Sequence, residues 1–168
     1  MSGLLTDQIR AMIGAERTYP AKEEIGGMAI RYFAIAVGDT DPLYYDDEYA
    51  RAQGYPSRIA PPTFITESGQ YAGNTPNAHG YLPHEWDWPA GFRTIRGGQD
   101  YTFARPVLPT DRISVRYRLE SIEEKSSRDG RGQLLAISLA EFIDADGAVV
   151  ATNRELFFLQ PLATKGAA

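Results

Sequence analysis

The sequence contains no cysteine, which excludes disulfide bonds, thiolate zinc sites and cysteine nucleophiles. Its two histidines, His79 and His84, leave little material for a histidine metal site, so we predict no bound metal. Basic residues are in the minority, with 17 lysines and arginines against 22 aspartates and glutamates, and the net charge is −5. A nucleic acid is therefore not an expected partner, because binding along its backbone needs a basic surface.

Long apolar runs are missing as well. No stretch approaches the roughly 18 apolar residues that a membrane-spanning helix needs. Near the N-terminus, Asp7, Gln8 and Arg10 interrupt the apolar residues, which is not the pattern of a signal peptide. The sequence therefore predicts a cytoplasmic protein that does not enter a membrane.

The chain length of 168 residues predicts one domain. Residues 4–15 carry apolar side chains at helical spacing, so residues 1–17 are predicted to form an N-terminal helix, with Thr6 at its start and Gly14 at its end. Residues 18–161 are predicted to form the domain itself. The small and polar residues 162–168 are predicted to be a flexible tail.

The first half of the domain has the pattern of helices joined by turns. A short extended segment with a proline is predicted as an edge strand, and three helices follow it. The strand is expected at 18–25 and the helices at 27–37, 46–53 and 64–72. Residues 74–92 hold three prolines and both tryptophans and are predicted to form a structured loop, which at this length is typical of a functional segment or an interface.

In the second half, apolar and polar residues alternate, which is the pattern of β-strands. Gly97 and Gly98 are predicted to mark a close approach of another backbone. Glycine-containing turns separate the last three strands, so the second half is predicted as an antiparallel meander and the chain as an α+β domain. A hot-dog fold, a long antiparallel sheet wrapped around a central helix, fits this order of elements, although composition does not distinguish it from other α+β sandwiches. The four strands are expected at 98–107, 112–126, 133–144 and 149–160.

Three motifs carry a resemblance to a known family. Residues 31–46, RYFAIAVGDTDPLYYD, resemble the signature of MaoC-like (R)-specific enoyl thioester hydratases, in which a helix ends in Gly-Asp-x-Asn-Pro-x-His-x-Asp. Residues 59–64 resemble the start of the central hot-dog helix, and residues 97–107 the strand that follows. The similarity extends over roughly residues 20–160 and is closest to the FAS1-like dehydratase, or MaoC N-terminal, type. Chains of that type are the front half of a double hot-dog hydratase or the accessory subunit of a two-part dehydratase.

The resemblance implies addition of water to a trans-2-enoyl thioester, or the reverse dehydration. Asp39 matches the family's catalytic aspartate, whereas Tyr44 stands at the position of its histidine. An ordinary phenol titrates near ~10 and is a poor base at neutral pH. The backbone N–H that polarises the thioester carbonyl falls at Pro62, which has none, or at Thr63 if the alignment shifts by one residue.

With both catalytic parts altered, the resemblance implies the non-catalytic half of a heteromeric hydratase. The expected partner is a MaoC-like hot-dog subunit with an intact aspartate and histidine, and the two would form a hetero-oligomer around an acyl tunnel. The substrate would be an acyl thioester of coenzyme A or of a carrier protein, with no cofactor. Arg93 and Arg96 are predicted to meet its phosphates at the tunnel mouth.

Other interpretations stay open. Asp39, next to Gly38, is also typical of a turn or capping residue, and Tyr44 of a packing residue. A homodimeric hydratase could use Asp39 with a displaced base, for which His79 or His84 is the first choice. A third possibility is a module that binds acyl-CoA without catalysis, since one fold serves many functions.

Overall fold

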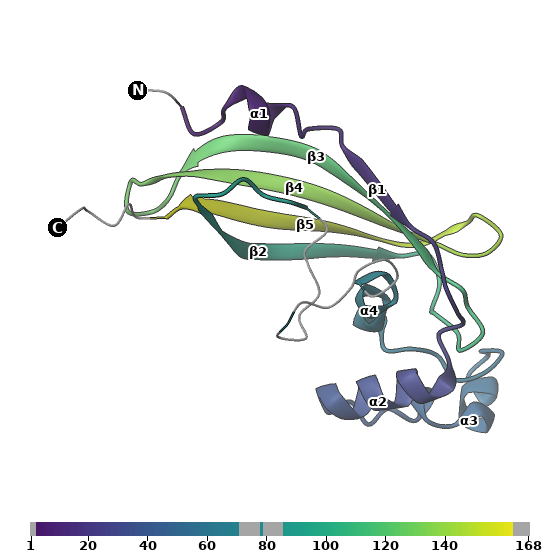
Figure 1. The fold of residues 1–168 in the computed structure, drawn as a ribbon. Coiled ribbons are helices and arrows are strands. Elements are labelled where there is room, and N and C mark those ends of the chain that lie inside the picture. Colours follow the sequence, from purple (N-terminus) through teal and green to yellow (C-terminus); the bar gives the residue numbers. More distant parts are fainter. Residues whose placement is uncertain (1–2, 71–77, 79–85, 163–168) are drawn as a thin grey trace.

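The computed structural model describes residues 3–70, 78 and 86–162. Long strands form one antiparallel sheet of five in the order β1-β3-β4-β5-β2. Figure 1 shows the sheet arching over α4, with α2 and α3 farther from it on the same side. The predicted α+β class is confirmed. The strands are β1 Glu16–Tyr19, β2 Phe92–Phe103, β3 Ser114–Ser126, β4 Gly132–Ile143 and β5 Val149–Pro161.

The last three strands lie within two residues of their predicted bounds, because their side chains alternate between a buried and a more exposed face. The prediction for β2 was wrong at both ends. This strand lies at one edge of the sheet, and most of its residues are exposed, so no apolar alternation marks its true start at Phe92. It ends at Phe103 rather than at residue 107, because Arg105 turns away to pair with Asp111 and Asp144.

The first helix, α1 Asp7–Arg10, is shorter than the predicted one. Thr6 begins it as expected, but the backbone of Gly14 and Ala15 hydrogen-bonds to Leu119 of β3 instead of continuing a helix. The predicted edge strand is β1, which does lie at an edge of the sheet but ends before Pro20.

The remaining helices follow their predictions closely. Helix α2 Gly27–Val37 ends at Gly38, which has a positive φ of 73° that suits a glycine. Helix α3 Asp47–Ala52 begins after Asp46, whose carboxylate accepts two backbone N–H groups. The 3-10 turn η2 Pro62–Phe64 leads into α4 Ile65–Gln70. None of the helices in these described ranges is long and apolar enough to cross a membrane.

The hydrophobic core lies on the inner face of the sheet, which is the face toward α4. Trp86 belongs to this core, and its indole N–H donates to Ser138 on β4 (2.9 Å), so this tryptophan anchors the end of the predicted loop. The largest fully buried side chains in the described chain are Phe142, Phe157, Ile30, Ile65, Leu119, Leu134 and Leu159.

An ion pair fastens α3 to the segment that precedes η2. Asp47 accepts hydrogen bonds from the backbone N–H, Nε and Nη2 of Arg58, each 2.9 Å long, and these bonds hold the pKa of Asp47 well below its ordinary range. A lowered pKa stabilises the fold above the unfolded value of about 4, and this contribution is lost as the pH falls toward the folded pKa.

We therefore expect Asp47→Asn to lower the free energy of unfolding at pH 7, and the difference from wild type to shrink at pH 3. Urea unfolding at both pH values measures this. Asp129→Asn is the control, because Asp129 also has a lowered pKa, of about 2, but it and Arg131 are exposed and their pair should contribute little. A deficit for Asp47→Asn that is the same at pH 3 and pH 7 would contradict the prediction.

Candidate functional site

The family motif forms a closed turn after α2. The backbone N–H of Asp39 donates to Ala34 (2.9 Å), and the hydroxyl of Tyr45 donates to the carbonyl of Asp39 (2.7 Å). The Asp39 carboxylate accepts the N–H of Asp41 (3.1 Å), which is the hydrogen bond of an aspartate-stabilised turn. Asp39 therefore has a structural role in the turn, which it fills with one of its two carboxylate oxygens, Oδ1.

Tyr44 is buried at the end of the 3-10 helix η1 Pro42–Tyr44, with 8% of its surface exposed. Burial, and next the negative charges of Asp39 and Asp41, raise the pKa of the Tyr44 phenol above its ordinary value. The phenol is consequently protonated at neutral pH and cannot accept a proton as the family's histidine does.

The start of η2 retains a free backbone donor. Pro62 has no N–H, and the N–H of Phe64 donates to the carbonyl of Pro61 (2.9 Å). The N–H of Thr63 makes no hydrogen bond to any described residue, and Thr63 is exposed. Of the two predicted substrate-binding positions here, Thr63 is the one able to polarise a carbonyl.

The two predicted phosphate-binding arginines lie on opposite faces of the sheet. Arg96 reaches the inner face, where it pairs with Glu155 (2.5 Å). Arg93 reaches the outer face, where its Nε and Nη2 donate to Gln160 (3.0 and 2.6 Å). One phosphate group therefore cannot be held by both arginines.

A polar cluster that the sequence analysis missed lies on the inner face beside α4. Glu155 is 6% exposed and accepts hydrogen bonds from Arg96 and Gln99. Tyr101 donates to Gln99 (2.9 Å) and also bonds to Thr66 of α4, which links the cluster to that helix. Burial raises the pKa of Glu155, while Arg96 and Gln99 act against this effect. A buried carboxyl group with a shifted pKa is a candidate for proton transfer.

The alternation along β5 holds the signal that could have revealed this cluster. Positions 151, 157 and 159 of the strand point to the core and are apolar, whereas Asn153 and Glu155 occupy the same face. Asn153 is 4% exposed, and its side-chain oxygen has no hydrogen-bond partner among the residues that the structure describes. Polar residues at core positions of a strand usually have a specific reason to be there.

A cavity of about 560 Å³ lies beside α2. Phe33 of α2 and Phe64 of η2 meet edge to face in its wall, with ring centroids 5.3 Å apart, while Glu67 of α4 adds a carboxylate. No group of three or more possible metal ligands occurs within residues 3–70, 78 and 86–162. His79 and His84 lie outside these described residues.

The model of the FAS1-like dehydratase domain region matches residues 11–153. The chain belongs to this dehydratase family. A UPF0336 protein of Streptomyces coelicolor is 37% identical over 115 residues, which cover 67% of this FAS1-like chain and 73% of that protein. The predicted family resemblance is thereby confirmed.

Two solved complexes from Mycobacterium tuberculosis resemble this FAS1-like chain in fold. A chain of the ChsH1–ChsH2 complex matches with a TM-score of 0.72 and 20% identity, covering 94% of this chain and 90% of that one. A chain of the C-terminally truncated HadBC complex, a (3R)-hydroxyacyl-ACP dehydratase, matches with a TM-score of 0.65 and 20% identity, covering 92% and 99%. The hot-dog fold predicted for the chain is confirmed, and its family is one of hydratases and dehydratases.

Proposed function

We propose that this chain is the non-catalytic half of an enoyl thioester hydratase or 3-hydroxyacyl thioester dehydratase. It would complete the acyl tunnel beside a hot-dog partner that carries the catalytic aspartate and histidine. The observation that carries the proposal is Tyr44, a buried phenol with a raised pKa at the position of the family's histidine. The cavity beside α2, with Phe33 and Phe64 in its wall, is the part of the tunnel that this chain would supply.

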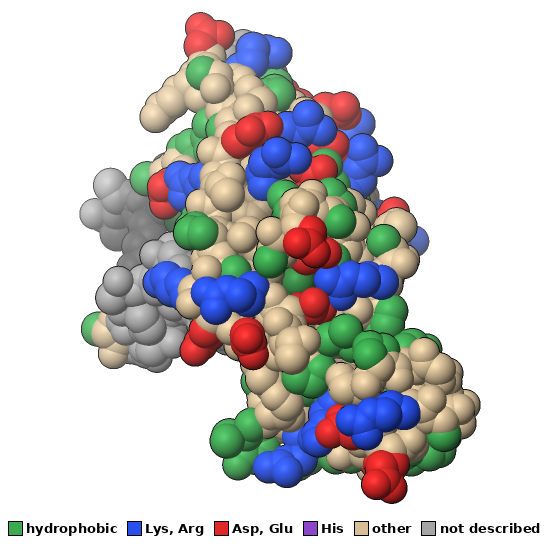
Figure 2. Space-filling model, turned by 90° about the vertical axis from the view of Figure 1, so that its right-hand side faces the viewer, with side chains coloured by type: hydrophobic (Ala, Val, Ile, Leu, Met, Phe, Trp, Pro, Cys, Tyr) green, Lys and Arg blue, Asp and Glu red, His purple; other side chains and the backbone are tan. Residues whose placement is uncertain are grey.

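The surface of α2 supports a partner subunit. Met28, Tyr32, Ile35 and Val37 are each between 56% and 63% exposed, which is unusual for large apolar side chains on one short helix. Figure 2 shows hydrophobic side chains at the surface of the lobe that α2 and α3 form below the sheet. The similar ChsH1–ChsH2 and HadBC chains also come from complexes. The cytoplasmic location, the absence of a cofactor, and the choice between coenzyme A and a carrier protein stay predictions.

The test is the loss of enoyl absorbance with crotonyl-CoA and a longer enoyl-CoA. We expect no hydration by the purified chain alone, and hydration when a MaoC-like protein from the neighbouring gene is added. Tyr44→Phe should keep the activity of the mixture within about twofold, because the phenol transfers no proton. Hydration at an ordinary enzyme rate by the chain alone would refute the proposal. Tight binding of a fluorescent acyl-CoA without turnover in the mixture would favour a binding module instead.

Glu155 favours a second candidate, a self-sufficient hydratase that uses Asp39 with a displaced base. Its carboxyl group is buried, has a raised pKa, and belongs to the cluster that reaches Thr66 of α4. A carboxylate can serve as a general base when its pKa lies near the working pH. If the chain alone proves active, Glu155→Gln and Asp39→Asn should each abolish that activity, and an unaffected Glu155→Gln enzyme would exclude Glu155 as the base.

A further inference from the structure

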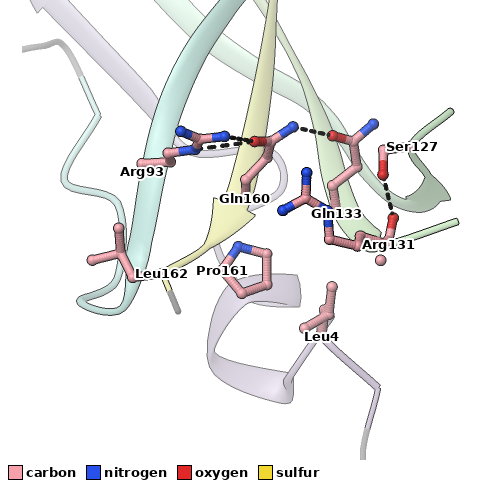
Figure 3. A pocket seen from close by; sticks show the side chains of 9 residues that line it. Leu4, Arg93, Ser127, Arg131, Gln133, Gln160, Pro161 and Leu162 are labelled. Atoms are coloured by element: carbon pink, nitrogen blue, oxygen red, sulfur yellow. Dashed lines mark hydrogen bonds between the residues drawn. The ribbon is translucent and has the colours of Figure 1, made fainter. Parts of the chain in front are cut away.

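A second cavity, of about 520 Å³, opens at the end of the sheet where β5 finishes at Pro161. Arg93 of β2, Gln160 of β5, and Gln133 of β4 stand side by side on one wall, and Arg131 from the β3–β4 turn faces them (Figure 3). Leu4 and Leu162 contribute apolar surface. The volume of this cavity is in the range of small-molecule sites. Of the site residues of the proposed hydratase, Arg93 lines this cavity and the others do not.

The hydrogen bonds among the side chains of this wall leave mainly N–H donors to contact a ligand. Arg93 donates twice to the side-chain oxygen of Gln160, and the Gln160 amide nitrogen donates to the side-chain oxygen of Gln133 (2.8 Å). The Gln160 oxygen therefore accepts two hydrogen bonds and the Gln133 oxygen accepts one (Figure 3). What the three side chains retain for a ligand is mainly N–H groups, above all one terminal nitrogen of Arg93 and the amide nitrogen of Gln133. Such a wall binds a group that is rich in acceptors.

The charge of the residues that line the cavity also favours a ligand rich in hydrogen-bond acceptors. Arg93 and Arg131 are both cationic, and none of the described residues that line the cavity carries a carboxylate. Arg93 hydrogen-bonds only to the neutral Gln160 among described side chains. Arg131 pairs with Asp129 through Nε and Nη2 and keeps Nη1 available. An anion that accepts several hydrogen bonds at once would complete this arrangement.

We propose that this cavity binds an organic phosphate, with the phosphate group on the Arg93–Gln160–Gln133 wall and on Arg131. A phosphate monoester brings three acceptor oxygens and close to two negative charges, which matches a lining of separate N–H donors better than a single carboxylate does. Leu4, Pro161 and Leu162 form the apolar surface against which the rest of the ligand packs. The site does not depend on the proposed hydratase role. The phosphate can belong to the nucleotide end of a coenzyme A thioester or to another organic phosphate.

The test is isothermal titration calorimetry on the purified full-length chain with phenyl phosphate, adenosine 3′,5′-bisphosphate and inorganic phosphate. We expect saturable one-to-one binding of at least one organic phosphate. Arg93→Gln and Arg131→Gln should each weaken it by at least about tenfold, because each removes charge-assisted hydrogen bonds. Leu162→Glu adds a carboxylate at the exposed residue that follows β5 while keeping both guanidinium groups, and should also abolish binding.

Arg128→Gln is the matched control, since Arg128 lies in the same β3–β4 turn as Arg131 but does not line the cavity. It should change the affinity by less than about twofold, because a charge outside the cavity is screened by salt. An equal loss with Arg128→Gln would show general electrostatic attraction and overturn the proposal. Absence of saturable binding of all three probes, or equal affinity for inorganic phosphate, would overturn it too. Tighter binding of the bisphosphate than of phenyl phosphate supports the nucleotide source, and the reverse order supports another organic phosphate.

Discussion

Replacement of Phe157 by alanine is expected to destabilise the protein by about 3–5 kcal/mol. Phe157 of β5 is fully buried on the inner face of the sheet. Its ring packs against Trp88, with centroids 5.8 Å apart, and under the guanidinium group of Arg96. Removal of the ring leaves a cavity that rigid strands on either side cannot close. Urea unfolding followed by tryptophan fluorescence measures the loss.

Phe158→Ala is the control for this prediction. Phe158 is the next residue of β5, so it points to the outer face of the sheet, where it is only partly buried. Its truncation should cost clearly less than that of Phe157, because water already reaches part of the ring. Equal losses for the two variants would mean that the inner face is not the main core of the molecule.

Gly97→Ala is expected to cost about 1–3 kcal/mol through a steric clash. A Cβ atom at position 97 would lie 2.5 Å from Cε2 and 2.9 Å from Cδ2 of Phe158. The pairing of β2 with β5 shifts register between Arg96 and Gly98, and Gly97 is the additional residue in this bulge. The close neighbour is therefore mainly the ring of Phe158, not a backbone as the sequence analysis expected.

Two further variants separate the clash from a general effect of removing a glycine. Gly98→Ala is the matched control, because a Cβ atom there meets nothing within 4 Å, and it should not lower the stability. In the Phe158→Ala background the Gly97→Ala penalty should largely vanish, which a double-mutant cycle of unfolding free energies measures. A penalty that persists without the Phe158 ring would contradict the steric explanation.

How well a strand could be predicted from the sequence depends on whether one of its faces is buried. Strands β3, β4 and β5 were predicted well because each has one face against the core and one toward water. Apolar and polar residues therefore alternate along their sequences. Strand β2 lacks this pattern at the edge of the sheet. The N-terminal helix was predicted too long because its apolar spacing does not reveal that Gly14 bonds to Leu119, about a hundred residues away.

The candidate site was predictable in part. The motif placed Asp39 and Tyr44 in one turn, and the missing N–H of Pro62 was evident from its chemistry. The separation of Arg93 and Arg96 was missed because the predicted strand began at residue 98. Both arginines lay outside that strand, so the alternation of strand side chains between the two faces of the sheet predicted nothing about them. The Glu155 cluster needs side chains from β2, β5 and α4, and only the pairing register of the folded chain brings these together.

The strand order β1-β3-β4-β5-β2 also has a consequence for the time course of folding. Strands β3, β4 and β5 follow one another through short turns, so their hairpins can close early, as local contacts do. Strand β1 pairs with β3 across a sequence separation of about a hundred residues, from Arg17 to Tyr117. On the ribosome, the N-terminal segment therefore emerges long before its neighbour in the sheet exists. Its docking against a meander that has already formed is expected to be a late step, and the step most exposed to interception by a chaperone.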